Sequence, residues 1–244
     1  MPTVSKDYKV SAIVSAYKSE RFLRGCLDDL EAQTMVERLE IVVVNSGSPE
    51  AEHAIVSEYA ERYDNIVYVR TPWREGVYAA WNRGVLMASG EYLTNANTDD
   101  RHRPDALEIL STTLDKYPEA GLVYAGYLAT STENETFESN TATEKFIPLD
   151  YDRSLLLRGY CFPGPQPMWR ASLHEEYGLF EPTYRSAGDL EFWLRVSQGH
   201  SFVRVPKALG LYLKSPESVE HSNPAAQAEA QHILAAYANA ERIR

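Results

Sequence analysis

The chain has 244 residues, a formal net charge of −11, and 44% hydrophobic and 24% charged residues, which is ordinary for a soluble globular protein. The negative charge argues against duplex nucleic acid or an anionic membrane surface as a partner, because both need basic protein surface. No run reaches the ~18 apolar residues of a membrane span, and no apolar signal segment opens the chain. The two cysteines form no disulfide framework, so a cytoplasmic location is expected.

Residues 9 to 117 alternate between strand and helix patterns. Short apolar runs predict strands at 10–15, 39–44, 66–70 and 91–95. Periodic apolar positions predict helices that follow Ser19, contain Ile55 and Tyr59, span 76–88, and begin at Pro104. This alternation predicts a mostly parallel central sheet with helices on both faces.

The rest of the chain is less regular. Residues 131–149 are polar and predict a long loop or a strand pair at the rim. A helix opens at 186–189, and two strands are expected at 202–205 and 209–213. An alanine-rich helix from about 224 to 244 closes the chain.

Three polar clusters follow predicted strands, at 15–17, 45–48 and 97–100. Ligands of parallel sheets gather at the carboxyl ends of the strands, so these clusters are expected to share one crevice. The oxygens of Asn97-Thr98-Asp99-Asp100 can hold a divalent cation against a diphosphate. The alternative is a turn and cap for the helix at Pro104.

Several motifs in this order resemble the family 2 glycosyltransferases of GT-A fold. Gly90-Glu91-Tyr92-Leu93 precedes Asn97-Thr98-Asp99-Asp100, and Pro104-Asp105 follows. The resemblance extends upstream to the strand at 10–17, to Val42–Ser48, and to Gly76 with Asn82 and Gly84. Downstream, Gly188–Arg195 is similar to the family's Glu-Asp segment and the helix after it. The match covers about residues 9–215.

The resemblance implies an α/β GT-A fold over residues 1–244 as a single domain. A nucleotide-sugar-binding half is expected at about 9–117. An acceptor half with a smaller sheet is expected at about 118–215, and a C-terminal loop and helix at about 216–244.

The chain departs from the family pattern at five positions. Asn97 replaces the first aspartate of the metal motif, and Asn45 replaces the aspartate that usually touches the base. Ser15 replaces a proline, Trp81 an arginine, and Gly188 the glutamate before the catalytic aspartate. Amides coordinate cations without bringing charge. The resemblance therefore implies Mg²⁺ or Mn²⁺ that is bound more weakly than usual or is dispensable, with Asp99 as the main ligand.

Asp189 is the candidate general base, because an acceptor hydroxyl must lose its proton as it attacks the anomeric carbon. The alternative is a capping box between Ser186 and Asp189, since acids are favoured in a first helical turn. Asp189 can be both the general base and part of the cap.

Further contacts are assigned by the resemblance and by sequence proximity. His221 is a second candidate metal ligand. Tyr17 is expected to pack against the base, with ordinary strand-end packing as its alternative. Trp169, Tyr160 and Phe162 can stack an acceptor sugar or lie in the core. The expected nucleotide-sugar contacts are Ser15, Tyr17, Asn45, Ser46, Asn82, Arg83, Asn97 and Thr98; further cations for the diphosphate are Arg74, Arg101 and Arg103.

The resemblance implies an inverting transferase that moves a sugar from a nucleotide-sugar donor, expected to be a UDP-sugar, to a glycan, lipid-linked or protein acceptor. Polysaccharide biosynthesis is the expected setting, and a homo-oligomer is left open. A nucleotidyltransferase is a rival hypothesis, but the loop at 15–19 lacks the glycines that cradle a triphosphate. A catalytically weak or inactive carbohydrate-binding or scaffolding module is the other, and it explains the amide substitutions.

Overall fold

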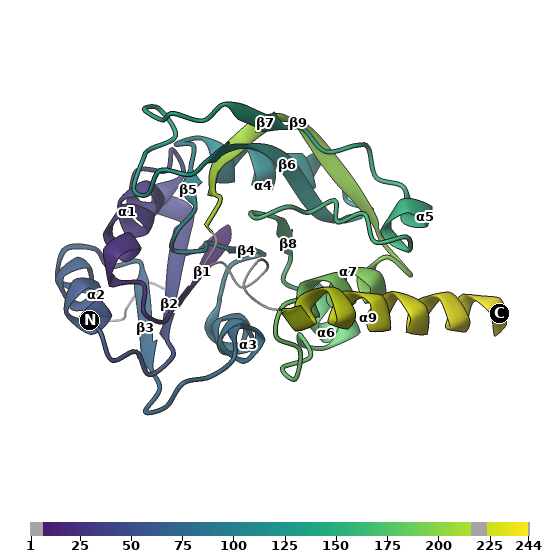
Figure 1. Ribbon diagram of the computed structural model, residues 1–244. Helices are drawn as coiled ribbons and strands as arrows, with labels where there is room; N and C mark the ends of the chain where they lie inside the picture. Colours follow the sequence, from purple (N-terminus) through teal and green to yellow (C-terminus); the bar gives the residue numbers. More distant parts are fainter. Residues whose placement is uncertain (1–6, 216–223, 244) are drawn as a thin grey trace.

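The computed structural model describes residues 7–215 and 224–243 (Figure 1). The strands are β1 (Val10–Ala16), β2 (Leu39–Asn45), β3 (Ile66–Arg70), β4 (Tyr92–Asn95), β5 (Arg101–His102), β6 (Ala120–Thr130), β7 (Glu144–Phe146), β8 (Met168–Arg170) and β9 (Ser201–Leu213). The helices are α1 (Glu20–Glu31), α2 (Glu52–Arg62), α3 (Val77–Met87), α4 (Ala106–Lys116), α5 (Arg153–Leu156), α6 (Leu173–Tyr177), α7 (Gly188–Val196) and α9 (Pro224–Ile243), with the 3-10 turn η1 (Val36–Arg38). None of these helices combines the length and apolar character that a bilayer span needs.

In this part of the chain the strands form one nine-stranded sheet, in the order β3-β2-β1-β4-β8-β6-β9-β5 with β7 beside β6. The first four strands in this order are parallel to one another. This confirms the strands predicted at 10–15, 39–44, 66–70 and 91–95. β2 is buried along its whole length, as its apolar sequence predicted.

The remaining strands extend the sheet in mixed directions. β8 runs antiparallel to both β4 and β6, and β6 runs parallel to β9. The prediction of two strands at 202–205 and 209–213 was wrong, because β9 is continuous. Its pairing with β6 skips two residues, since Ala125 pairs with Val205 and Gly126 with Ala208. Pro206 lies in that gap and cannot donate to the ladder, so the strand bulges instead of ending.

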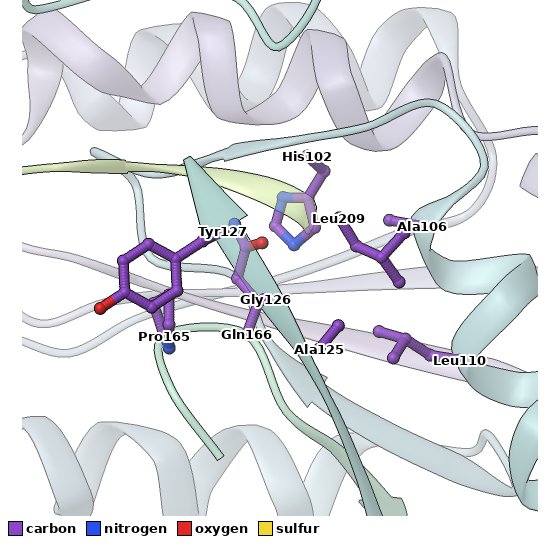
Figure 2. Close-up of a pocket in the computed structure, with 9 residues that line it drawn as sticks. All are labelled: His102, Ala106, Leu110, Ala125, Gly126, Tyr127, Pro165, Gln166 and Leu209. Carbon is purple, nitrogen blue, oxygen red and sulfur yellow. The ribbon is translucent and has the colours of Figure 1, made fainter. Parts of the chain in front are cut away.

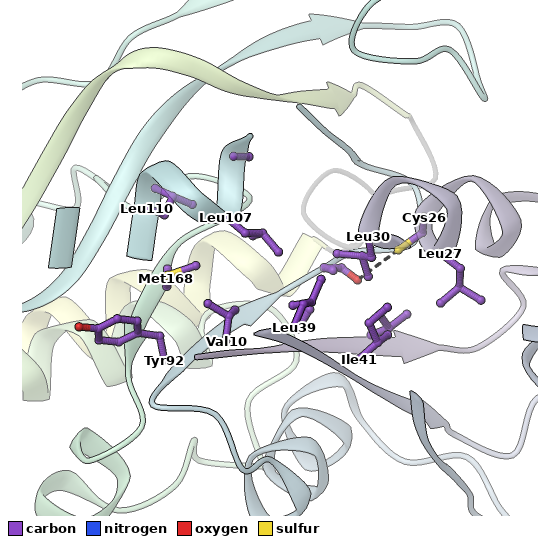
Figure 3. Close-up of a cluster of buried hydrophobic side chains, with 14 of the residues drawn as sticks. Val10, Cys26, Leu27, Leu30, Leu39, Ile41, Tyr92, Leu107, Leu110 and Met168 are labelled. Carbon is purple, nitrogen blue, oxygen red and sulfur yellow. Dashed lines mark hydrogen bonds between the residues drawn. The ribbon is translucent and has the colours of Figure 1, made fainter. Parts of the chain in front are cut away.

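Apolar side chains pack against both faces of the sheet. On one face, Leu27 and Leu30 of α1 meet Val10 of β1 and Ile41 of β2 (Figure 3). Cys26 is buried in the same cluster, as its helix position predicted, with Sγ 3.9 Å from a backbone carbonyl oxygen. The other face carries a cluster of large aromatic residues from β8, α7 and the segment between α6 and α7. The two-sided packing is the layered arrangement that the alternating pattern predicted.

The C-terminal helix belongs to the aromatic side of the molecule. α9 contacts α7 and contributes Ile233, which is 1% exposed, to the aromatic cluster. In Figure 1 it lies alongside α7 and reaches beyond it toward the C-terminus. A helix docked in this way can influence the residues at the start of α7.

Candidate active site

The loops that follow β1 and β2 are bonded to each other at the carboxyl edge of the sheet. The Ser46 amide donates to the Ala16 carbonyl at 2.9 Å, and the Lys18 amide donates to Ser48 Oγ at 3.0 Å. The buried Glu52 carboxylate accepts from the Ser19 amide and from Ser48 Oγ, both at 2.8 Å. Ser19 occupies the predicted N-cap position of α1, but its side chain makes no capping bond. One buried carboxylate therefore holds both loops in place.

Asn45 and Tyr17 lie on either side of these loops. Asn45 is fully buried, and its Oδ1 accepts the Ser48 amide at 2.9 Å. A backbone N–H can only donate, so the orientation of the Asn45 amide is fixed, and its Nδ2 donates to the Tyr68 hydroxyl at 3.3 Å. The Arg74 guanidinium lies 4.3 Å from the centre of the Tyr17 ring. Tyr68 was missed in the sequence, where only a tyrosine in a short apolar strand marked it.

Ser46 anchors the loop that leads into α3. Its Oγ donates to the Glu75 carbonyl at 3.1 Å and accepts from the Glu75 amide at 2.7 Å. Arg83 grips the same Glu75 through its carboxylate, at 3.1 and 2.5 Å. Gly47 has a φ of 63°, and a Cβ there would lie 2.5 Å from the Trp73 backbone. Ser46 and Arg83 thus stabilise this loop, and their contacts with a nucleotide stay predictions.

Asn82 is bonded across the aromatic side of the molecule. Its Nδ2 donates to the Phe180 carbonyl at 2.8 Å, and its Oδ1 accepts the Phe180 amide at 2.9 Å. Trp81 packs edge-on against Phe180 with ring centres 5.4 Å apart. The structure gives Asn82 a role in holding the chain between α6 and α7, and its contact with the donor stays a prediction.

The loop at 97–100 brings two carboxylates together. Asp100 is buried, accepts from Asn97 Nδ2 at 3.0 Å, and accepts the Leu213 amide of β9 at 3.2 Å. Burial raises the pKa of Asp100 well above its ordinary value, and the adjacent Asp99 charge adds to this effect. Burial also raises the pKa of Asp99, while the charge of Arg21 lowers it. Asp100 therefore fixes the loop to the sheet, and Asp99 is the carboxylate left for a ligand.

The donor set fits a cation that arrives with a diphosphate. Among residues 7–215 and 224–243, no group of three or more His, Cys, Asp or Glu side chains could hold a metal ion. Mg²⁺ is commonly bound by one or two carboxylates, with phosphate oxygens and water completing its shell. Asp99 beside the Asn97 amide and Thr98 matches that chemistry. His221, the other predicted metal ligand, lies outside the described residues.

Two of the arginines proposed for the diphosphate are paired with carboxylates of the chain. Arg101 is committed to a two-point pair with Asp29 at 2.7 and 2.6 Å, and Arg103 to a pair with Asp105. Lys18 and Arg21, together with Glu20 and Glu50, line an open groove of about 430 Å³ beside the loop that follows β1. Lys18 directly follows Tyr17, and Arg21 lies four residues after it.

A small internal cavity of about 10 Å³ lies between β5, α4, β6 and β9 (Figure 2). His102 and Gln166 are among its lining residues, and burial lowers the pKa of His102 to about 4. The space is that of roughly one water molecule. This cavity is therefore too small to be the donor site.

Asp189 is the second residue of α7 and is partly buried. Its Oδ1 accepts a 2.9 Å hydrogen bond from the Tyr78 hydroxyl of α3. α3 begins two residues after Glu75, which is bonded to Ser46, so the candidate base is connected to the crevice through this short segment.

The capping box that was the alternative for Ser186 and Asp189 is not formed. The helix begins after Ala187 without a side-chain cap from its own segment. The Glu229 carboxylate of α9 instead binds the segment just before the helix, accepting the amides of residues 185, 186 and 187 at 2.9, 2.8 and 2.9 Å, and Ser186 Oγ at 3.2 Å. The sequence could not place a residue 40 positions downstream at this helix start.

The aromatic residues proposed for acceptor stacking lie mainly in the core. Trp169 is 1% exposed and Phe162 is fully buried, which confirms the core alternative for both. Tyr160 packs on Phe162 with ring centres 4.6 Å apart. Ser15 and Thr98 lie at the carboxyl ends of β1 and β4, and their donor contacts stay predictions.

The sheet order, the loops gathered at its carboxyl edge and the aspartates at 99 and 100 define a GT-A nucleotide-sugar transferase fold. A model of the glycosyl transferase family 2 sequences matches residues 11–178, and the chain belongs to that family. The putative glycosyltransferase EpsH of Bacillus subtilis is 30% identical over 213 residues, which cover 85% of this chain and 59% of that protein. This chain thus spans little more than half of that relative.

Solved structures share the fold at lower identity. TarS of S. aureus in complex with UDP-GlcNAc is 18% identical with a TM-score of 0.75, over 94% of this chain and 66% of that chain. The mannosyltransferase PcManGT from Pyrobaculum calidifontis, in complex with GDP-Man and Mn²⁺, is 19% identical with a TM-score of 0.69, over 98% and 65%. These likenesses confirm the predicted fold class.

Proposed function

We propose that this chain is an inverting glycosyltransferase that moves a sugar from a UDP-sugar to a hydroxyl of a glycan, lipid-linked or protein acceptor. Membership of glycosyl transferase family 2 supports the reaction class. The UDP-GlcNAc held by TarS supports a uridine nucleotide as the donor. The cytoplasmic location, the homo-oligomer and the division into halves at about residue 117 stay predictions.

The observation that carries the proposal is the placement of Asp189. This carboxylate is partly buried, begins a helix, and bonds to the first turn of α3, whose preceding loop is bonded to Ser46 at the end of β2. We expect this acidic group to face the loop of Asp99 across the crevice, where a general base is needed.

The chemistry follows from these positions. The acceptor oxygen forms a bond to the anomeric carbon as its proton passes to the Asp189 carboxylate. The bond from that carbon to the donor phosphate oxygen breaks, and the nucleoside diphosphate leaves with the electron pair. Attack from the face opposite the diphosphate inverts the anomeric configuration. A divalent cation at Asp99 would supply charge stabilisation for the departing diphosphate.

A donor panel and one variant test the proposal. UDP-, GDP- and dTDP-sugars, each with and without Mn²⁺, are compared by the rise in melting temperature of the full chain. The most stabilising donor is then used to measure release of nucleoside diphosphate. Asp189→Asn should keep the donor's thermal shift and lose at least about a hundredfold in turnover, since a general base contributes 10²–10⁴-fold. Turnover equal to the parent's would remove Asp189 from the mechanism.

A further inference from the structure

A buried tyrosine faces the candidate base. Tyr78, the second residue of α3, donates its hydroxyl to Asp189 Oδ1 at 2.9 Å, across 111 positions of sequence. Tyr78 is only 3% exposed. Its position is therefore set by packing and does not depend on the substrate.

The surroundings of Tyr78 leave its ring little freedom. The ring stacks on Phe180 with centres 6.1 Å apart and meets Trp81 edge-on at 5.4 Å. A Cβ at position 188 would lie 2.8 Å from two atoms of the ring, so Gly188 is needed wherever Tyr78 occupies this place. Gly188 is also the position at which the chain departs from the family's glutamate. The glycine at position 188 therefore makes room for the ring of Tyr78.

Tyr78 stays protonated over the neutral range. Burial, and then the negative charge of Asp189, raise the pKa of Tyr78 far above its ordinary value. The phenol therefore donates a hydrogen bond and does not exchange the reaction's proton. That makes it a group that acts on Asp189 and not on the substrate.

We propose that Tyr78 is a positioning residue for the Asp189 carboxylate. This inference rests on the proposed function, in which Asp189 is the base. A rigid donor on Oδ1 restricts rotation of the carboxylate, and a misplaced catalytic group loses rate steeply. A hydrogen bond to the charged form of a carboxyl group also favours that form.

Tyr78→Phe removes the hydroxyl and keeps the ring. Its kcat should fall about tenfold, as expected for the loss of one hydrogen bond to a charged group. The KM for the donor should change less than about twofold, because the tyrosine is buried beside the base. The acid limb of the kcat profile should move to higher pH, because the carboxylate loses a bond that favours its ionised form. The measurement is nucleoside diphosphate release with water as acceptor, across about pH 5 to 9.

Tyr92→Phe is the matched control. Tyr92 is 1% exposed, and its hydroxyl donates to Asp115 Oδ1 at 2.7 Å. It lies at the amino end of β4, away from the crevice at the carboxyl ends. The same atom is therefore removed from another buried tyrosine, whose aspartate partner is exposed. Melting temperature should fall, while kcat and the acid limb should stay those of the parent.

The outcomes separate the two claims. A slow Asp189→Asn, together with a slow Tyr78→Phe whose acid limb is shifted, supports the positioning role. A slow Asp189→Asn with parental kcat and acid limb in Tyr78→Phe overturns the positioning role and leaves the proposed function standing. A fast Asp189→Asn overturns both. Adding Tyr78→Phe to Asp189→Asn should cause no further loss, and a further tenfold loss would show that Tyr78 acts independently of Asp189.

Discussion

Removing the Glu229 carboxylate should loosen the start of α7 and destabilise the chain. Glu229 accepts the backbone amides of residues 185, 186 and 187 and one serine hydroxyl. Burial pushes the pKa of Glu229 upward, but the amides outweigh burial and hold this pKa below its ordinary value. The carboxylate is therefore charged at neutral pH. A negative charge at a helix start is favourable both as an acceptor and toward the helix dipole.

The magnitude follows from the bonds that are lost. Hydrogen bonds to a charged group contribute about 1.5–3 kcal/mol, and water can replace part of this set because Glu229 is only partly buried. Glu229→Ala should therefore cost about 2 kcal/mol, which lowers the melting temperature by roughly 4–8 °C in a chain of this size. The melting temperature of Glu229→Gln should lie between those of the parent and of Glu229→Ala. Its amide oxygen can still accept from the amides of Ser186 and Ala187, whereas its NH₂ group would face the amide of Arg185.

The assay is thermal unfolding followed by circular dichroism, with donor turnover measured on the same samples. Gln231→Ala is the control, because Gln231 is an exposed residue on the same helix and should shift melting by less than about 2 °C. Turnover should fall with stability for Glu229→Ala, since α7 carries Asp189. A melting temperature within about 1 °C of the parent's would refute the anchoring role of Glu229.

Two further predictions concern pH and metal. Burial lowers the pKa of His174 to about 4, and its Nε2 already accepts from Trp169 Nε1 at 3.0 Å. The pKa of histidine in the unfolded chain is near 6.5, so the unfolded state binds a proton that folded His174 does not bind until about pH 4. The free energy of unfolding is therefore highest above pH 6.5 and falls as the pH falls toward 4, by about 2 kcal/mol between pH 7 and 5. In urea unfolding, His174→Gln should reduce the dependence of the free energy of unfolding on pH, and the part that remains comes from buried His102. An unchanged pH dependence would contradict the reasoning. Asp99→Asn should abolish the extra thermal shift that Mn²⁺ adds to a donor, and an undiminished Mn²⁺ effect would exclude Asp99 as the ligand.

The sequence predicted the parts of the fold that depend on local patterns. Apolar runs located the parallel strands because strands buried on both faces tolerate few polar residues. Turn residues after them located the crevice, because parallel strands end on one edge. The sequence predicted two strands in place of β9 because proline usually ends a strand. In the structure the strand continues past Pro206 through a bulge.

The sequence proposes those candidate site residues that belong to a short continuous motif. Asp99 and Asp189 came from short motifs, and both are partly buried; their roles stay predictions. The partners that orient the site are distant in sequence: Tyr78 reaches Asp189 across 111 positions, and Glu229 reaches Ser186 across 43. Single-sequence patterns report periodicity and local turns, and such long-range pairs leave no mark on either.

A crystal structure of the full chain with an intact nucleotide sugar and Mn²⁺ tests the central claim most directly. The account predicts a diphosphate beside Asp99 and the Asp189 carboxylate on the opposite side of the anomeric carbon, within hydrogen-bond reach of a water or acceptor hydroxyl there. A donor bound with Asp189 on the same side as the diphosphate, or beyond reach of the sugar, would contradict it.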